Sequence, residues 1–146
     1  MKVVVAIDSF KGSVTSAELN QAVKTAILSF SPEIKVETFE IADGGEGSLS
    51  AVKTGLGGHY INVETVDLLQ RPLQASYLLI DGELAFIEAA EVVGIDKVIP
   101  SEETVQKATT FGLGALFLDA KKRGATEIIL SLGGTGSSDG GLGLLQ

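Results

Sequence analysis

The chain has 146 residues, 45% of them hydrophobic, which is long enough for one ordinary domain with a real core. Its 11 basic and 19 acidic residues give a net charge of −8 without a basic stripe. Nucleic acid is therefore excluded as an expected partner, because affinity for a phosphate backbone depends on clustered lysine and arginine. The absence of cysteine excludes disulfides and thiolate metal sites.

The apolar segments are too short to span a bilayer, so no membrane partner is expected. The N-terminal apolar run carries one basic residue and is cut off by Asp8, which does not fit a secretory signal peptide. Together with the lack of cysteine, these features predict a cytoplasmic location.

The first sixty residues alternate strand, loop and helix patterns. Residues 2–7 form a near-continuous β-branched run, typical of a strand buried on both faces. Thr15 and Glu18 form a capping box that predicts a helix ending near Pro32, with apolar residues on one face at Leu19, Ala22, Val23, Ala26, Ile27 and Phe30. A second strand over 36–41 and a short helix over 48–55 follow. This alternation predicts an α/β fold with a parallel sheet covered by helices.

The pattern changes after residue 58. Segments 60–66, 73–80 and 84–89 are strand-like, and Asp81-Gly82 joins the last two as a hairpin turn. A helical region runs from Ser101 to Gly124, and a final strand covers 126–132. Antiparallel strands after a parallel beginning predict a second α/β unit, so we divide the chain into residues 1–60 and 61–146.

Glycine-rich loops follow three expected parallel strands, at residues 8–13, 43–47 and 133–141. In open α/β sheets, ligands bind beyond the carboxyl ends of the strands, so we expect the three loops on the rim of one sheet. Glycine lets the backbone approach an anion closely, and helix N-terminal amides supply hydrogen-bond donors.

The first loop combines Ser9, Lys11 and Ser13. Its ammonium group could neutralise a carboxylate or a phosphate. The alternative is a solvated lysine in a surface loop whose serines cap the next helix.

Asp43 and Glu46 flank the glycines of the second loop. Two carboxylates on a tight loop can hold Mg²⁺ or accept hydrogen bonds from substrate hydroxyls. In the alternative, both only complement the N-terminus of the next helix.

The third loop matches neither common phosphate-binding motif. A Walker A loop has lysine where Leu142 stands, and a dinucleotide fingerprint has glycine where Asp139 stands. A carboxylate beside a phosphate is repulsive unless a metal or a proton transfer uses it, so we interpret Asp139 as a metal ligand or a general base. The alternative is an N-cap for a helix starting at Gly140.

Two further titratable residues stand apart from the loops. Glu88, at the end of an apolar strand, is either exposed by alternation or aimed into a cleft. His59, with no cysteine and no second histidine in the chain, is expected to be a solvated loop residue.

Three segments, DSFKGS (8–13), ADGGEGS (42–48) and GGTGSSDGG (133–141), resemble in order the signatures of the class I bacterial glycerate kinases. Residues 87–90 (IEAA) and 110–114 (TFGLG) are secondary matches, and the resemblance extends over the whole chain. Gly136 and Ser138 stand where the family usually has Ala and Asn, and Gln70 stands where it tends to have Gly.

The resemblance implies a Rossmann-like or flavodoxin-like parallel sheet with helices, plus an inserted α/β domain, with the active site in the cleft between them. Residues 1–60 then form the N-terminal part of the Rossmann-like domain, and residues 61–146 part of the inserted domain with its antiparallel strands. Family members are more than twice as long, so we expect an N-terminal portion of the enzyme. Self-association or a complementary chain is expected to complete it.

The implied activity is ATP-dependent phosphorylation of D-glycerate, commonly at the 2-hydroxyl, with ATP and Mg²⁺ as the cofactors. We expect Lys11, Asp43 and Asp139 to be catalytic, and Asp43, Glu46 and Asp139 to hold the metal. The expected substrate-binding residues are Ser9, Lys11, Gly12, Ser13, Asp43, Gly44, Gly45, Glu46 and Gly47. The expected nucleotide- and phosphate-binding residues are Gly133, Gly134, Thr135 and Ser138.

Two alternatives remain open at the level of the sequence. The chain could be a non-catalytic module that binds a small molecule or phosphate, or one half of a split enzyme. It could also be an unrelated α/β nucleotide-binding domain, against which the Walker A and dinucleotide mismatches count.

Overall fold

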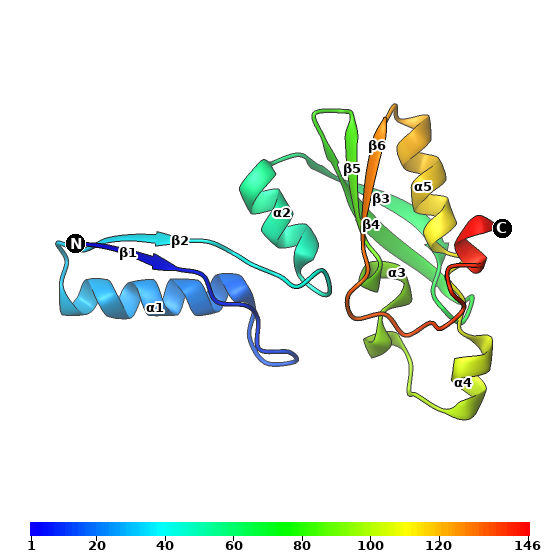
Figure 1. The fold of residues 1–146 in the computed structure, drawn as a ribbon, viewed down its shortest axis with the longest axis horizontal. Coiled ribbons are helices and arrows are strands. Elements are labelled where there is room, and N and C mark those ends of the chain that lie inside the picture. Colours follow the sequence, from blue (N-terminus) through cyan, green and yellow to red (C-terminus); the bar gives the residue numbers. More distant parts are fainter.

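The computed structural model describes residues 1–146 and divides into two groups of elements (Figure 1). The first group, here called the N-terminal lobe, contains β1 (Lys2–Val5), α1 (Ser16–Phe30) and β2 (Lys35–Thr38). β1 and β2 pair in parallel, and α1 lies alongside them. The predicted capping box is present: the Thr15 side chain accepts from the Glu18 amide, and the Glu18 carboxylate accepts from the Thr15 amide.

The second group, here called the sheet lobe, is built on four strands in the order β3-β4-β5-β6. β3 (His59–Val66), β4 (Pro72–Ile80) and β5 (Leu84–Glu88) are antiparallel neighbours, and β6 (Glu127–Ser131) pairs in parallel with β5. Segment 39–47 connects the two lobes.

Helices cover both faces of this sheet. α2 (Ser48–Leu56) packs on β4 and β5, and α5 (Leu113–Lys122) packs on β3 and β4 from the opposite face. The remaining helical turns are α3 (Ala90–Val93), η1 (Ile95–Lys97), α4 (Glu102–Lys107) and η2 (Gly143–Leu145). None of the helices is long and apolar enough to cross a membrane.

The main hydrophobic core lies between the sheet and α5, because alternate residues of β4 and β5 point to that face. Tyr77 and Ile87 from the strands meet Leu113 and Leu116 from the helix, all with an exposed fraction of 1% or less. A smaller cluster of Leu49, Leu78 and Ile80 lies under α2. The N-terminal lobe has no comparable core, since its buried residues are Val5 and Asn20.

The structure confirms the mixed α/β fold, with a parallel strand pair, helices and a second sheet containing antiparallel strands. The division of the chain at residue 60 stays a prediction. Here α2, which precedes that position, packs on the sheet lobe.

Two sequence-based expectations are wrong. β6 joins β5 rather than β1 and β2, so the three loops do not lie on the rim of one sheet. Residues 2–7 are not buried on both faces: the strand is two-stranded with β2 and covered by one helix, which leaves Val4 56% exposed. For the same reason Phe30, expected on the apolar face of α1, is 90% exposed.

Candidate functional site

The three glycine-rich loops meet where the two lobes face each other. They line a cavity of about 110 Å³, here called the central cavity, formed by Asp8, Ser9, Lys11, Asp43, Gly45, Glu46 and Gly134. The loops thus converge although their strands belong to two sheets. The first loop approaches from the N-terminal lobe and the third from the sheet lobe, and the second lies on the connecting segment.

Hydrogen bonds from Asn20 and Ser16 of α1 hold the starts of the first two loops together. Asn20, 2% exposed on α1, accepts from the amide of Ile7 at 3.1 Å and donates to the carbonyls of Ile7 and Phe39 at 3.2 and 3.0 Å. The Ser16 hydroxyl donates to the same Ile7 carbonyl at 2.7 Å and accepts from the amide of Ile41 at 3.2 Å. The chain after β1 and the chain after β2 are therefore fixed side by side, which brings Asp8 and Asp43 to one cavity.

The first loop is a tight turn closed by Phe10 and Val14, whose amides and carbonyls bond at 2.9 and 3.1 Å. Lys11 lies near the tip, and its ammonium group forms no ion pair within the chain. Gly12 and Ser13 line an adjoining cavity of about 220 Å³, here called the outer cavity, which also contacts Ser9, Lys11 and Glu46. The predicted residues of this loop therefore line two neighbouring cavities, which have Ser9, Lys11 and Glu46 in common.

The second loop turns sharply before α2. One oxygen of the Asp43 carboxylate accepts from the amide of Gly45 at 2.9 Å, and the Ser48 hydroxyl donates to the Gly45 carbonyl at 2.7 Å. Gly44 and Gly47 have φ of +94° and +90°, a backbone conformation that residues with a side chain rarely adopt. The carboxylate of Glu46 and the second oxygen of Asp43 have no partner in the chain, so both can bind a ligand.

The third loop docks on the second by backbone contact alone. The amide of Gly133 donates to the Gly44 carbonyl at 2.8 Å, and a Cβ on Gly133 would lie 2.4 Å from the Gly45 nitrogen. The Gly133 amide is therefore already used, whereas the amides of Gly134 and Thr135 donate to no acceptor in the chain. Gly134 lines the central cavity, so its amide is the donor of this loop placed for an anion there.

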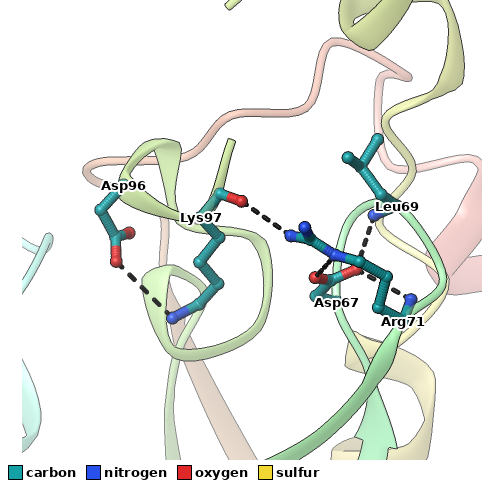
Figure 2. A network of polar contacts seen from close by, with 5 residues as sticks. All are labelled: Asp67, Leu69, Arg71, Asp96 and Lys97. Carbon is teal, nitrogen blue, oxygen red and sulfur yellow. Dashed lines mark hydrogen bonds and ion pairs between the residues drawn. The ribbon is translucent and has the colours of Figure 1, made fainter. Parts of the chain in front are cut away.

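The third loop is also paired with the segment after α3. The Gly134 carbonyl accepts from the amide of Ile95 at 2.8 Å, and the amide of Gly136 donates to the Val93 carbonyl at 2.7 Å. Figure 2 shows what holds this segment from behind: Arg71 donates to the buried carboxylate of Asp67 at 2.6 Å and to the Lys97 carbonyl at 2.7 Å. The turn between β3 and β4 thereby supports the loop.

Asp139 lies apart from the central cavity. Its carboxylate accepts from the amides of Thr110, Gly141 and Gly143 at 2.8, 3.0 and 3.1 Å, and from the hydroxyls of Thr110 and Thr109. Burial raises the pKa of Asp139, but these hydrogen bonds lower it by more than burial raises it. The pKa of Asp139 is therefore well below its usual range. Its contacts are those of an anchor that joins the third loop to the turn before α5. Its role as metal ligand or base stays a prediction.

Thr135 and Asp139 line a separate, more apolar cavity of about 340 Å³. Ser138 is exposed and lines neither this cavity nor the central one. The structure thus brings six of the predicted residues to the central cavity: Ser9, Lys11, Asp43, Gly45, Glu46 and Gly134. Gly12 and Ser13 line the outer cavity, and neither cavity is lined by Gly44, Gly47, Gly133, Thr135, Ser138 or Asp139.

The donor set of the central cavity fits Mg²⁺ in part. No group of three or more carboxylate or histidine side chains is arranged to hold a metal ion, so the predicted set of Asp43, Glu46 and Asp139 is not assembled. Magnesium, however, is often held by one or two carboxylates together with substrate phosphates. Asp43 and Glu46, which face the same cavity, meet that requirement.

Glu88 is buried rather than exposed, with an exposed fraction of 2%. Its carboxylate accepts from the amide of Leu49 at 2.9 Å, at the start of α2. Burial raises the pKa of Glu88 to about 6, the charges of Glu91 and Glu46 add to the rise, and the Leu49 hydrogen bond opposes it. His59, at the first position of β3, is exposed.

Two residues of the site were absent from the sequence-based prediction. Asp8 lines the central cavity, and its signal was available: it is the first polar residue after a strand, as Asp43 is in the second loop. Asn20 carried no such signal, because one polar residue inside a helical pattern does not reveal that it bonds two strand ends.

Taken together, the molecule is an α/β protein whose glycine-rich acidic loops form a small polar cavity with one lysine. The chain belongs to the glycerate kinase family, whose model matches residues 3–146. It is 35% identical over 148 residues to glycerate 2-kinase of Escherichia coli K12 and 36% identical over 147 residues to a glycerate kinase of Bacillus cereus.

A crystal structure assigned to glycerate kinase 2 of Salmonella typhimurium LT2 is similar with a TM-score of 0.81 and 33% identity, over 100% of this chain and 39% of that one. The two relatives above are likewise matched over 100% of this chain and 39% of their own length. The chain therefore spans about two fifths of the length of these relatives.

Proposed function

We propose that the central cavity binds D-glycerate and the transferring phosphoryl group of ATP, and that the protein carrying this chain phosphorylates the 2-hydroxyl of glycerate. The observation that carries the proposal is the meeting of an unpaired Lys11 ammonium with the unpaired carboxylate oxygens of Asp43 and Glu46. Unpaired charges of both signs on one cavity suit a ligand that carries an anion and hydroxyls. The names of the relatives supply the substrate.

Phosphoryl transfer depends mainly on positioning and on stabilisation of charge. In the proposed arrangement, Lys11 with Ser9 binds the glycerate carboxylate or the transferring phosphoryl group, and the Gly134 amide donates to phosphate. The bond between the γ-phosphorus and the bridging oxygen breaks, a bond to the glycerate hydroxyl oxygen forms, and ADP leaves. The free oxygen of Asp43 accepts the hydroxyl proton. Mg²⁺ would be held by the Glu46 carboxylate together with the substrate phosphates and would supply positive charge to the phosphate oxygens, which leaves the free oxygen of Asp43 for the proton.

Incubation with ATP, Mg²⁺ and D-glycerate tests this proposal. We expect formation of ADP that depends on glycerate, and ³¹P NMR of the product distinguishes 2-phosphoglycerate from 3-phosphoglycerate. Replacement of Mg²⁺ by EDTA is expected to stop turnover. Absence of glycerate-dependent ADP formation by a protein of the relatives' full length would remove glycerate phosphorylation as the function.

A second candidate is binding without turnover, in which the chain acts as a small-molecule module or as one half of a split enzyme. The observation that favours it is the open face of the two-stranded sheet, where Val4 is 56% exposed. Glycerate would then raise the Tm of the chain without ADP formation. Turnover that appears only on mixing with a second chain would identify the split enzyme.

A further inference from the structure

Helix α2 begins without a capping side chain of its own. Its N-cap residue is Gly47, and the hydroxyl of Ser48 donates back to the Gly45 carbonyl. The amide of Leu49 is satisfied instead by Oε2 of Glu88, which comes from the end of β5, 39 residues later in the chain. A carboxylate that accepts from a helix N-terminal amide is favoured by hydrogen bonding and by the helix dipole. Glu88 therefore caps α2 from a different element.

The same carboxylate lies beneath the second loop. Ser131 stands opposite Glu88 in the β5–β6 register, and a Cβ on Gly44 would lie 3.8 Å from the Ser131 Cβ. The Ser131 hydroxyl oxygen is buried without a hydrogen-bond partner. A buried polar pair from two neighbouring strands thus underlies the loop that carries Asp43 and Glu46, although hydrophobic residues would fill this space at lower cost.

We propose that Glu88 is a positioning residue: by capping α2 at Leu49, it fixes the second loop so that Asp43 and Glu46 face Lys11 across the central cavity. Glu88 does not line that cavity, so it acts through the loop and not on the ligand. The inference rests on the proposed function only for the identity of the ligand.

Amide hydrogen exchange of the 146-residue chain, measured by NMR, tests the cap directly. In Glu88→Gln, which keeps the shape and removes the charge, we expect the Leu49 amide to exchange about tenfold faster, with a larger effect in Glu88→Ala. Amides of β4 and α5 should keep their wild-type rates in Glu88→Gln. The matched control is Glu91→Gln, which removes a nearby negative charge that accepts no hydrogen bond from the loop. It should leave Leu49 unchanged.

Stability and binding are expected to change in opposite directions in Glu88→Gln. The titratable groups that face Glu88 are Glu46 of the loop, Glu91 of α3 and Tyr60 of β3. Because burial raises the pKa of Glu88 from 4.5 to about 6, the folded state holds the proton more tightly, so its stability falls as pH rises from about 4.5 through 6. Glutamine does not titrate, so the Glu88→Gln variant does not lose stability over this pH range. Its Tm at pH 7.5 should therefore equal or exceed that of the wild type. Its affinity for D-glycerate should nevertheless drop about tenfold.

The outcomes separate the two proposals. Faster exchange confined to Leu49 and the second loop supports the positioning role even if glycerate does not bind, in which case only the proposed function fails. Unchanged exchange at Leu49 in both Glu88 variants overturns it, as does faster exchange that is uniform over the whole chain. If Glu88→Ala does not fold, Glu88→Gln alone decides between these outcomes.

Discussion

At the scale of single residues, Lys11 provides the positive side-chain charge that lines the central cavity. Its neighbours there are carboxylates and small polar groups, and it forms no ion pair with any of them. Residue types such as Lys11, Asp43 and Glu46 could be selected from the sequence because charged groups in glycine-rich loops are informative by themselves. The saturation of Asp139 by five donors could not, since three of those donors belong to Thr109 and Thr110, 29–30 positions earlier, and the other two are amides of the turn that follows.

Replacement of Lys11 by alanine tests its part in binding and catalysis. Loss of a charge-assisted contact to the carboxylate or phosphoryl group is expected to lower kcat/KM for glycerate by about 100-fold. Steady-state kinetics of the active protein measure this effect. Lys121→Ala, an exposed lysine on α5 without an ion pair, is the control and should have wild-type kinetics. Wild-type turnover in Lys11→Ala would remove the residue from the mechanism.

Asp139→Asn tests the structural anchoring by this carboxylate. We expect the free energy of unfolding at pH 7 to fall by about 2–3 kcal/mol, because the amide cannot replace the charged hydrogen bonds. Since the hydrogen bonds hold the folded-state pKa low, the wild-type advantage is present above the unfolded pKa of about 3.9 and is lost as pH falls below it. Urea unfolding at pH 7 and pH 3 measures both effects. Equal stability of variant and wild type at pH 7 would contradict the anchoring role, and Ser138→Ala serves as the neutral control.

At the scale of elements, signals confined to a few neighbouring residues were predicted well. The capping box of α1 and the Asp81-Gly82 turn between β4 and β5 are present as expected, because their geometry depends on local hydrogen bonds. The partner of β6 was predicted wrongly, since a parallel strand carries no local mark of the neighbour to which it pairs. The loops therefore meet across two sheets and not on the rim of one as predicted, and only Gly134 of the third loop lines the central cavity.

Gly133→Ala tests the backbone contact between the second and third loops. The added Cβ would lie 2.4 Å from the Gly45 nitrogen, where neither backbone can yield without moving a loop. We expect unfolding free energy to fall by about 2–3 kcal/mol and ligand binding in the central cavity to be lost. Gly55→Ala in α2, where the added Cβ meets nothing, should instead gain about 0.5–1 kcal/mol. Urea denaturation of the two variants measures both changes, and equal stabilities would show that the loops are not in contact.

At the scale of the whole molecule, the two lobes are unequally stabilised. The sheet lobe contains a core cluster of 12 buried residues, whereas the N-terminal lobe buries only Val5 and Asn20. A single segment connects them, and there Glu40 accepts from the hydroxyls of Ser50 and Thr54 on α2 at 2.8 and 3.0 Å. Such arrangements are not encoded in short motifs, which explains why the sequence alone did not assign α2 to the sheet lobe.

Hydrogen exchange should detect this inequality. Amides of β1 and β2 are expected to exchange at least about tenfold faster than those of β4 and β5, because local opening of the N-terminal lobe exposes little buried surface. Exchange measured by mass spectrometry on the unliganded chain resolves these strands. Equal protection of β1 and β4 would show instead that the chain opens as one cooperative unit.

The central cavity takes Lys11 from one lobe and Gly134 from the other, although the polypeptide joins these lobes through one segment. The volume of the central cavity therefore depends on the angle between the two lobes and is not fixed by either lobe alone. A ligand that contacts both lobes restricts their relative rotation. The lost rotational entropy reduces the net free energy of binding. The affinity of a ligand at this cavity therefore depends on how freely segment 39–47 lets the two lobes rotate.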